Sequence, residues 1–249
     1  MKKIIFFGLF SFFIATIWQL PLVFAKPYIE KAMKQVKMQN VSGTIWNGKA
    51  KQLNLNGRNI NNVKWQVRPL KSLTTLSLNL LFHINDSNLT ANGVARLTPA
   101  KELIFNDTKF TLDANYLNTL QPNAKLSGDI IGNIKYANLD QVNLPKINGI
   151  VNWNDAAISS PIKLPQGDYH ALITPDNEGL NIKLTSSDGP AELNGNIKLN
   201  QEWLYDANIS IKAIDKGLAS MLKLVGRAQP NGVVKIKQKG DLKPFIGKK

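Results

Sequence analysis

The sequence predicts an all-β protein: one N-terminal transmembrane helix, followed by a duplicated, curved antiparallel β-sheet structure with one short helix near the C-terminus. Three observations predict it. Apolar and polar side chains alternate along most segments after Val41, as in residues 76–84 and 193–199, and this period of two is typical of half-buried antiparallel strands. Clusters rich in Asn, Gly, Asp and Pro separate these segments at short intervals, as hairpin turns require. Residues 4–25 carry no charge, which is typical of a membrane-spanning helix.

The N-terminal segment is predicted to be a membrane anchor over residues 1–25. The charged start, residues 1–3, precedes the 22 uncharged residues Ile4–Ala25, and about 20 residues are needed to cross the hydrocarbon core as a helix. Trp18 lies near the far end, where aromatic side chains favour the membrane interface. A cleaved signal peptide is the alternative, because residues 23–25 resemble a cleavage site, although the apolar region of such peptides usually spans about 7–15 residues. Both interpretations export the remainder of the chain.

A basic juxtamembrane helix is predicted over residues 26–40. Pro27 suits the start of a helix, and Ile29, Met33 and Val36 follow at helical spacing. The segment contains four lysines and a single acidic residue: Lys26, Lys31, Lys34, Lys37 and Glu30. It either lies on lipid headgroups or serves as a plain spacer before the β structure.

An internal repeat divides the β region into a first repeat over residues 41–125 and a second over residues 126–249. The offsets between matching positions are 102–107 residues, and the matches follow the same order along the chain. Two similar curved sheets are therefore expected. Within the second repeat, Lys216–Leu224 has the apolar spacing of a short helix. The matching motifs are GTIWNGKA (43–50) with GIVNWNDA (149–156), and NGVARL (92–97) with NGNIKL (194–199).

Four tryptophans of the β region are predicted to be core anchors rather than platforms on which a ligand stacks. Aromatic side chains bury the largest apolar area per residue, which favours a place in the core. A glycine ahead of the tryptophan in two of the motifs indicates a bend or a close backbone approach that leaves room for the indole. The four residues are Trp46, Trp65, Trp153 and Trp203.

The composition excludes several classes of function. The chain has no Cys, which removes disulfides, thiol catalysis, iron–sulfur clusters and cysteine-based zinc sites. His83 and His170 are its two histidines, and they are too far apart in the sequence to indicate a histidine-rich metal site. The net charge is +14, but the basic residues are mostly scattered lysines rather than arginines or runs of charge. No metal, no cofactor and no nucleic-acid partner is therefore expected.

Asp168 and His170 form the one pair that suggests acid–base catalysis, and we predict that it has no catalytic role. The sequence contains no G-x-S-x-G elbow, no H-E-x-x-H helix and no phosphate-binding glycine loop ahead of a helix. A strand histidine without a partner motif is more often a satisfied or exposed side chain. The protein is therefore predicted not to be an enzyme, with no catalytic, cofactor-binding or metal-binding residue.

Several features together resemble one known family. They are the charged start with its single span, GTIWNGKA at 43–50, WQVRPL at 65–70, GIVNW at 149–153, LNGNIKL at 193–199 and the helix at 218–226. In these features the chain resembles type II secretion system protein N. The resemblance implies an accessory or scaffold subunit of the type II protein secretion machinery, with no catalytic residues. It implies a single-pass inner-membrane protein whose bulk is periplasmic and whose partners are other components of the secretion system.

A second class of function stays open at this point. A membrane-anchored, twisted and duplicated sheet can curve into a groove whose dry face shields acyl chains, so a periplasmic lipid-handling protein is the alternative. A scaffold would instead use exposed sheet edges to pair with its partners. An open trough lined by Ile, Leu and Phe would favour lipid handling, whereas a trough filled by the protein's own Trp and Phe side chains would not.

Overall fold

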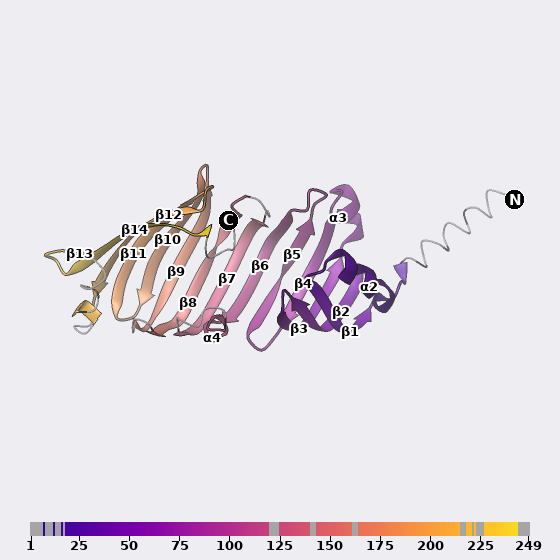
Figure 1. The fold of residues 1–249 in the computed structure, drawn as a ribbon, viewed down its shortest axis with the longest axis horizontal. Helices are drawn as coiled ribbons and strands as arrows, with labels where there is room; N and C mark the ends of the chain where they lie inside the picture. Colours follow the sequence, from indigo (N-terminus) through magenta and orange to yellow (C-terminus); the bar gives the residue numbers. More distant parts are fainter. Residues whose placement is uncertain are drawn as a thin grey trace. The chain divides into compact units, whose positions relative to one another are not determined.

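The protein is nearly all β, with a few short helices, as the alternation predicts (Figure 1). A computed structural model describes Phe7, Phe12, Thr16 and residues 18–119, 125–139, 143–160, 164–214, 218–220, 222 and 227–243. The chain divides into two compact units, Met1–Pro99 and Ala100–Lys249.

The first unit contains one antiparallel sheet in which each strand pairs with the next along the chain, in the order β1-β2-β3-β4-β5. Consecutive pairing of this kind needs short connections, and the turn between β2 and β3 is the Asn-Gly pair that two-residue hairpins favour. Asn56 and Gly57 both have positive φ, at 52° and 84°, as the turn between paired Leu55 and Arg58 requires. The elements are α2 (Leu22–Ala32), β1 (Val36–Gly43), β2 (Asn47–Leu55), β3 (Arg58–Val67), α3 (Pro69–Thr74), β4 (Leu78–Asn85) and β5 (Leu89–Leu97).

Asparagines also sit inside strands, where the backbone departs from regular extended geometry. Asn40 of β1 and Asn62 of β3 have φ of 50° and 53°, a region that asparagine tolerates better than most residues. The pairing register skips both positions, because Gln39 and Val41 pair with Gln52 and Ala50 while Asn40 has no partner in the ladder. The abundance of asparagine therefore serves irregular strand positions as well as turns.

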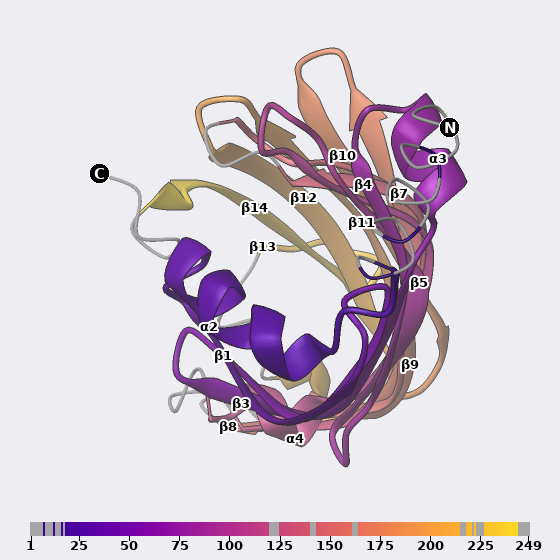
Figure 2. The same cartoon turned by 90° about the vertical axis from the view of Figure 1, so that its right-hand side faces the viewer.

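The sheet of the first unit curves around α2, as Figure 2 shows. The side chains of its apolar face come from alternate positions, such as Val63, Trp65 and Val67 of β3 opposite Ile84, Phe82 and Leu80 of β4. Leu22 of α2 is fully buried against this side of the sheet. The core of the first unit thus lies between one helix and one face of the sheet.

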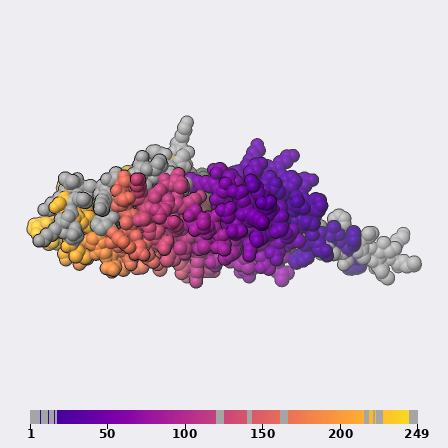
Figure 3. All heavy atoms as spheres, turned by 90° about the horizontal axis from the view of Figure 1, so that it is seen from below, coloured from indigo at the N-terminus to yellow at the C-terminus, as the bar shows by residue number. Residues whose placement is uncertain are grey.

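The second unit repeats the same principle of consecutive pairing, in the order β6-β7-β8-β9-β10-β11-β12-β14-β13. In the space-filling view, its surface passes from magenta to yellow in sequence order, as such a meander requires (Figure 3). Its elements are β6 (Leu103–Asp113), α4 (Ala114–Leu117), β7 (Lys125–Leu139), β8 (Lys146–Ser160), β9 (Leu164–Asp176), β10 (Gly179–Asp188), β11 (Ala191–Asn200), β12 (Leu204–Ala213), β13 (Arg227–Ala228) and β14 (Val233–Asp241).

The predicted helix near the C-terminus is present in the residues that are described, since 218–220 and 222 are helical. Leu218 and Leu222 are buried together with Ala191 of β11 and Val234 of β14. Ile211, Ala213 and Ile236 pack around this cluster. The helix therefore covers the apolar face of the sheet at the β11–β14 end.

The predicted helix over residues 26–40 differs from the observed structure. Helix α2 begins earlier, at Leu22, contains Pro27 in its interior, and ends at Ala32. Residues from Val36 onward form β1, because Val36 and Met38 pair with Leu55 and Leu53 of β2 and place their apolar side chains on one face.

Two short helices were not predicted from the sequence. Helix α3 begins with Pro69 at its first turn, a position where a proline costs no hydrogen bond. Helix α4 begins after Asp113, whose carboxylate accepts a hydrogen bond from the Asn115 backbone N–H. Both helices have at most six residues, which is too short for a helical period to stand out.

Half of the predicted transmembrane span, Ile4–Ala25, lies outside the described residues. Pro21 is extended (φ −65°, ψ 139°) and forms a β-bridge with Thr44, and Leu22–Ala25 belong to α2. A single helix therefore does not continue to Ala25, which corrects the predicted end of the span. Among the described residues, no helix combines the length and the apolar character needed to cross a membrane.

The structural division at Pro99 differs from the repeat boundary predicted at residue 125. Trp46 lies in the connection between β1 and β2, whereas Trp153 lies within β8. The two tryptophan motifs thus lie in unlike local structures. The duplication of the chain stays a prediction that their placement does not support.

Candidate functional site

Helix α2 lies over the apolar face of the first unit without closing onto it. Glu30 holds the helix to β1, because its Oε1 accepts a hydrogen bond from the Met38 backbone N–H at 2.6 Å. The same oxygen lies 3.4 Å from Lys26 Nζ. The Met38 hydrogen bond, helped by the charge of Lys26, lowers the pKa of Glu30 despite the opposing effect of burial. The carboxylate also satisfies an N–H on the outer edge of β1, which would otherwise be open to another strand.

A cavity of about 860 Å³ separates α2 from the sheet. Its side chains are aliphatic, aromatic or thioether groups, and their polar groups are the Tyr28 hydroxyl and the indole N–H groups of two tryptophans. From α2 and the segments next to it come Leu20, Leu22, Phe24, Ala25, Tyr28, Ile29, Met33 and Val36. From the strands and the β1–β2 connection come Met38, Ile45, Trp46, Leu53, Val63, Trp65, Val67, Leu78, Leu80 and Phe82.

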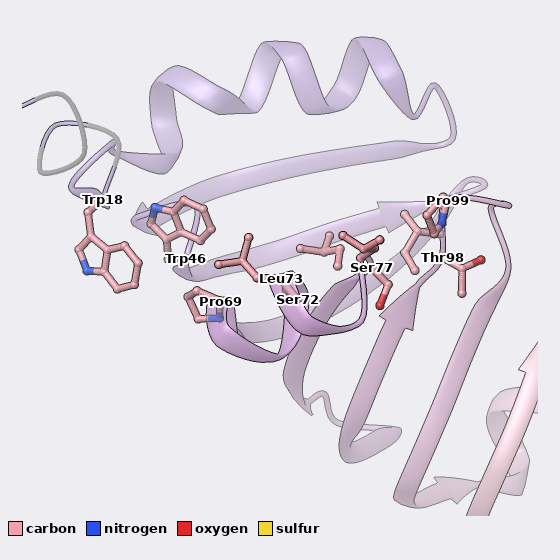
Figure 4. A pocket seen from close by; sticks show the side chains of 11 residues that line it. Trp18, Trp46, Pro69, Ser72, Leu73, Ser77, Thr98 and Pro99 are labelled. Carbon is pink, nitrogen blue, oxygen red and sulfur yellow. The ribbon is translucent and has the colours of Figure 1, made fainter. Parts of the chain in front are cut away.

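A second cavity of about 630 Å³ adjoins the first, and the two share Trp46 and Leu78 as lining residues. Figure 4 places Trp18 and Trp46 at one end of this cavity and Pro99 at the other, with α3 along its side. The rings of Trp18 and Trp46 stack, with centroids 5.5 Å apart and planes 20° apart. We call the two adjoining cavities the apolar groove. It lies wholly within the first unit.

Trp65 shows how the groove is built from the strand register. Gly48 of β2 lies directly opposite Trp65 of β3, and a Cβ at Gly48 would come within 2.3 Å of the Trp65 ring. Only a glycine leaves space for the indole there. The Trp65 Nε1–H donates to the Ile45 carbonyl oxygen at 3.2 Å, so the polar edge of the ring is satisfied while its apolar surface lines the groove.

The four tryptophans were predicted to be core anchors, and the structure buries them less completely than that prediction requires. All four are half-buried rather than fully buried. Trp46 and Trp65 line the apolar groove, and Trp153 lines a smaller cavity of the second unit. The Trp153 Nε1–H donates to the Ser127 carbonyl oxygen at 3.0 Å, which orients that indole as the equivalent bond orients Trp65.

The smaller cavity of the second unit has a volume of about 360 Å³ and lies against β7–β11. Trp153 and Tyr169 form its aromatic wall, with ring centroids 6.4 Å apart. Burial raises the pKa of the Tyr169 hydroxyl, which is therefore neutral at physiological pH. The remaining lining side chains are Ile130, Val151, His170, Ala171, Leu184 and Leu193.

Asp168 and His170 are not brought together as an acid–base pair. Asp168 accepts a hydrogen bond from the Asp155 backbone N–H at 2.8 Å, and the Nδ1 of His170 pairs with the side-chain oxygen of Asn152. The amide of Asn152 carries no negative charge, so it cannot stabilise a protonated imidazole as a carboxylate would. Within the described residues, no three His, Asp or Glu side chains lie together as a metal site would require.

The sequence suggested a hydrophobic groove only as part of the lipid-handling alternative and did not locate it beside residues 22–33, although part of its signal is visible there. Leu22, Ala25, Ile29 and Met33 recur at intervals of three and four, which places them on one face of a helix. The first two were assigned to the membrane span, because an uncharged segment that begins at Ile4 hides the change of role after Pro21.

Comparison with known proteins identifies the family. Residues 34–237 match the family of type II secretion system (T2SS) protein N, over most of the chain. The chain belongs to this family. No curated protein and no solved structure matches it significantly. The resemblance seen in the motifs is therefore confirmed, and as a member of the protein N family the chain is a component of the type II secretion machinery.

The family match covers only part of the groove. It begins at Lys34, so the sheet residues of the groove lie inside the part shared with protein N, while α2 precedes it. The motif residues Trp46 and Trp65 are both groove residues. In this member of the protein N family, the two motifs at 43–50 and 65–70 thus help to build the apolar face of the first unit.

Proposed function

We propose that the chain is an accessory or scaffold subunit of the type II secretion machinery, anchored in the inner membrane with its bulk in the periplasm. Membership in the protein N family carries this proposal. The uncharged segment Ile4–Ala25 supports an anchor, since it has the length that a bilayer requires. The proposed subunit is not an enzyme and uses no cofactor. Its work is to hold other secretion components in place.

The outer edge of β14 is the surface that we propose for such contacts. Strand β13 pairs only with Val234 and Lys235, and no other described strand pairs with this edge beyond them. The Val233 carbonyl oxygen accepts a hydrogen bond from the Gln229 N–H on the outer side. Because backbone groups alternate along a strand, the N–H groups of Lys237 and Lys239 face outward as well. An open edge of this kind can accept a strand from a partner.

The side chains at this edge favour an acidic partner strand. Lys235, Lys237 and Lys239 are all exposed and stand two residues apart, so they share one face of β14. Lys239 Nζ is paired with the Asp206 carboxylate at 2.9 Å, which shows that a carboxylate on a neighbouring strand reaches this row. Lysines along an edge also protect it from nonspecific pairing, so a cognate strand must supply matching negative charge.

Replacing Lys237 by proline tests the edge. Lys237→Pro removes an outward N–H and should leave the β12–β14 ladder intact, whereas Gln238→Pro removes an inward N–H and should unfold this part of the sheet. We expect Lys237→Pro to keep wild-type protein abundance while co-purification of other secretion components is lost. Secreted protein should then accumulate in the periplasm.

Two results would count against the proposal. Normal secretion and full recovery of partners with Lys237→Pro would remove β14 as the contact edge. A secretion defect in His170→Ala at normal abundance would indicate proton-transfer chemistry and contradict a scaffold, since the imidazole pairs only with Asn152 among the interactions described for it.

A further inference from the structure

We propose that the apolar groove of the first unit binds an acyl chain of an anionic phospholipid taken from the bilayer. The proposal rests on the proposed function only in that the anchor keeps the groove near a membrane. Binding itself depends on the shape and chemistry of the first unit.

The lining of the groove selects hydrocarbon over peptide. In the larger cavity, the Trp65 indole N–H is already bonded to the Ile45 carbonyl oxygen, and the other side-chain polar groups are the Trp46 N–H and the Tyr28 hydroxyl. A peptide in this space would bury backbone N–H and C=O groups that find almost no partners, which is costly. A hydrocarbon chain has no such groups to satisfy and gains from leaving water.

The edge next to the groove gives a peptide little to pair with. The outward Met38 N–H of β1 is occupied by the Glu30 carboxylate, so strand addition beside α2 is blocked at that point. The groove therefore differs from the open edge of β14, where no described strand pairs with the outward backbone groups of Lys237 and Lys239. A lipid suits the groove, and a protein strand suits that edge.

Exposed apolar side chains mark the mouth of the groove along α2. Phe24 is 65% exposed, Tyr28 is 76% exposed and Met33 is 42% exposed, although all three line the cavity. A contiguous apolar patch of this kind is typical of a surface that meets lipid or another protein. Trp18 is 53% exposed and stacks on Trp46. Aromatic side chains of this kind favour the membrane interface.

The charges around the mouth indicate an anionic headgroup. Lys31 and Lys34 flank Met33 in the sequence, and both are exposed. Lys26 is committed to Glu30, the one acidic residue between Trp18 and Asn40, so the local balance is positive. Lysines at the end of an apolar surface attract the phosphates of anionic lipid while the acyl chain enters the groove.

The position of α2 in the chain brings this mouth to the membrane surface. Helix α2 has 11 residues, about 16 Å of helix, and it separates the extended Pro21 from Met33 at the mouth of the groove. A groove that begins so close to the end of an uncharged segment can take a lipid without leaving the headgroup region. The phospholipid is therefore expected to come from the bilayer in which the chain is anchored.

Photolabelling of the purified full-length protein tests the proposal. The protein is reconstituted in vesicles of phosphatidylethanolamine and phosphatidylglycerol that contain a phosphatidylglycerol probe with a photoreactive acyl chain, and labelled residues are mapped by mass spectrometry. We expect labels on residues of the larger cavity, such as Leu53, Val63 and Leu80. A neutral phosphatidylcholine probe should label them less.

Two neighbouring residues of β4 provide a matched pair of variants. Leu80→Trp fills the groove, because Leu80 lines it, whereas Leu81→Trp makes the same change at a side chain that is 40% exposed and points to the other face. We expect loss of groove labelling in Leu80→Trp and unchanged labelling in Leu81→Trp. The double variant Lys31→Glu, Lys34→Glu should lose the preference for the anionic probe.

Several outcomes would overturn the proposal. Equal groove labelling in the two tryptophan variants, or wild-type labels confined to residues 4–25, would show that the groove holds no lipid. If Leu80→Trp does not fold, the wild-type map alone decides between these outcomes. Loss of a co-purified secretion component in Leu80→Trp, with no lipid label in the wild type, would make the groove a protein site. The labelling uses the purified protein alone, so its failure leaves the proposed scaffold function untouched.

Discussion

At the scale of single residues, packing across neighbouring strands depends on small and large side chains lying opposite each other. Gly48 faces Trp65 in the first unit, and Gly132 faces Phe110 in the second, where a Cβ would come within 2.0 Å of the phenyl ring. In both pairs the aromatic ring lies over the neighbouring backbone instead of standing away from the sheet. The glycine thus decides where the ring goes, and with it the shape of the apolar face.

Replacing Gly48 by alanine should destabilise the protein, because the new Cβ would lie 2.3 Å from the Trp65 ring. We expect a loss of about 1–3 kcal/mol in the free energy of unfolding, as overpacking usually costs. Urea denaturation followed by tryptophan fluorescence measures it. Lys49→Ala, at the next residue of the same strand, is the control and should change stability by less than about 0.5 kcal/mol. Equal stability of both variants would refute the close contact.

Glu30 makes the attachment of α2 to β1 depend on pH. Its pKa is lowered in the folded protein from the ordinary 4.5, mainly by the Met38 N–H and also by Lys26. A carboxyl whose pKa is lower in the folded state contributes stability above its unfolded pKa, and this contribution is lost as the pH falls through the folded value. Wild type should therefore be more stable than Glu30→Gln at pH 7, and the difference should shrink below about pH 4.5. A difference that does not vary with pH would show that the charge of Glu30 contributes nothing.

At the scale of elements, each sheet has one apolar face, and a helix covers only part of it. In the second unit, the helical residues 218–220 and 222 cover the β11–β14 end through Leu218 and Leu222. Further along the face, the cavity beside Trp153 and Tyr169 stays open. Because a helix covers only part of each apolar face, some apolar surface of the sheet stays exposed.

Leu222→Ala should remove much of the contact between this helix and the sheet. Leu222 is 6% exposed, and truncating a buried leucine to alanine costs about 2–5 kcal/mol. Leu204→Ala makes the same chemical change on β12 at a side chain that is 46% exposed, and it should cost far less. Denaturant unfolding of the two variants, compared with wild type, measures both losses. Similar values for the two would show that the helix is not held by Leu222.

At the scale of the whole molecule, the proposed anchor would fix the chain at its N-terminal end. The structure adds a reason for retaining the N-terminal segment. Leu22 is fully buried, and Trp18 and Leu20 line the groove, so these residues belong to the folded first unit as well as to the proposed anchor. Cleavage after Ala25 would cut α2 in its first half and remove all three.

The N-terminal segment is therefore expected to stay attached in the mature protein. N-terminal sequencing of protein extracted from membranes should give the residues that follow from Met1. A sequence that starts at Lys26 would show that the segment is a signal peptide and that the first unit folds without Leu22. In that case the fully buried position of Leu22 should be refilled by other side chains, and a protein expressed from Lys26 should be as stable as the full chain.

The sequence by itself determined the β architecture and the family. Alternation in segments such as Leu193–Leu199 predicts strands because a period of two puts one row of side chains on one face, wherever that face lies. The Asn56–Gly57 pair suits its hairpin because both residues adopt positive φ there. The prediction that Asp168 and His170 have no acid–base role rests on the missing motifs alone. These properties are local, so local sequence is sufficient to predict them.

Only the tertiary structure decided what covers each apolar face. Leu22 and Ala25 have the same hydropathy whether they cross a bilayer or pack on a sheet, and the sequence did not distinguish the two roles. Trp65 was expected in a closed core, but α2 is held above the sheet by Glu30 and Met38, which leaves the groove open. Hydrophobicity records that a side chain avoids water and does not record which surface shields it. That choice depends on contacts between segments, which appear only once the chain is folded.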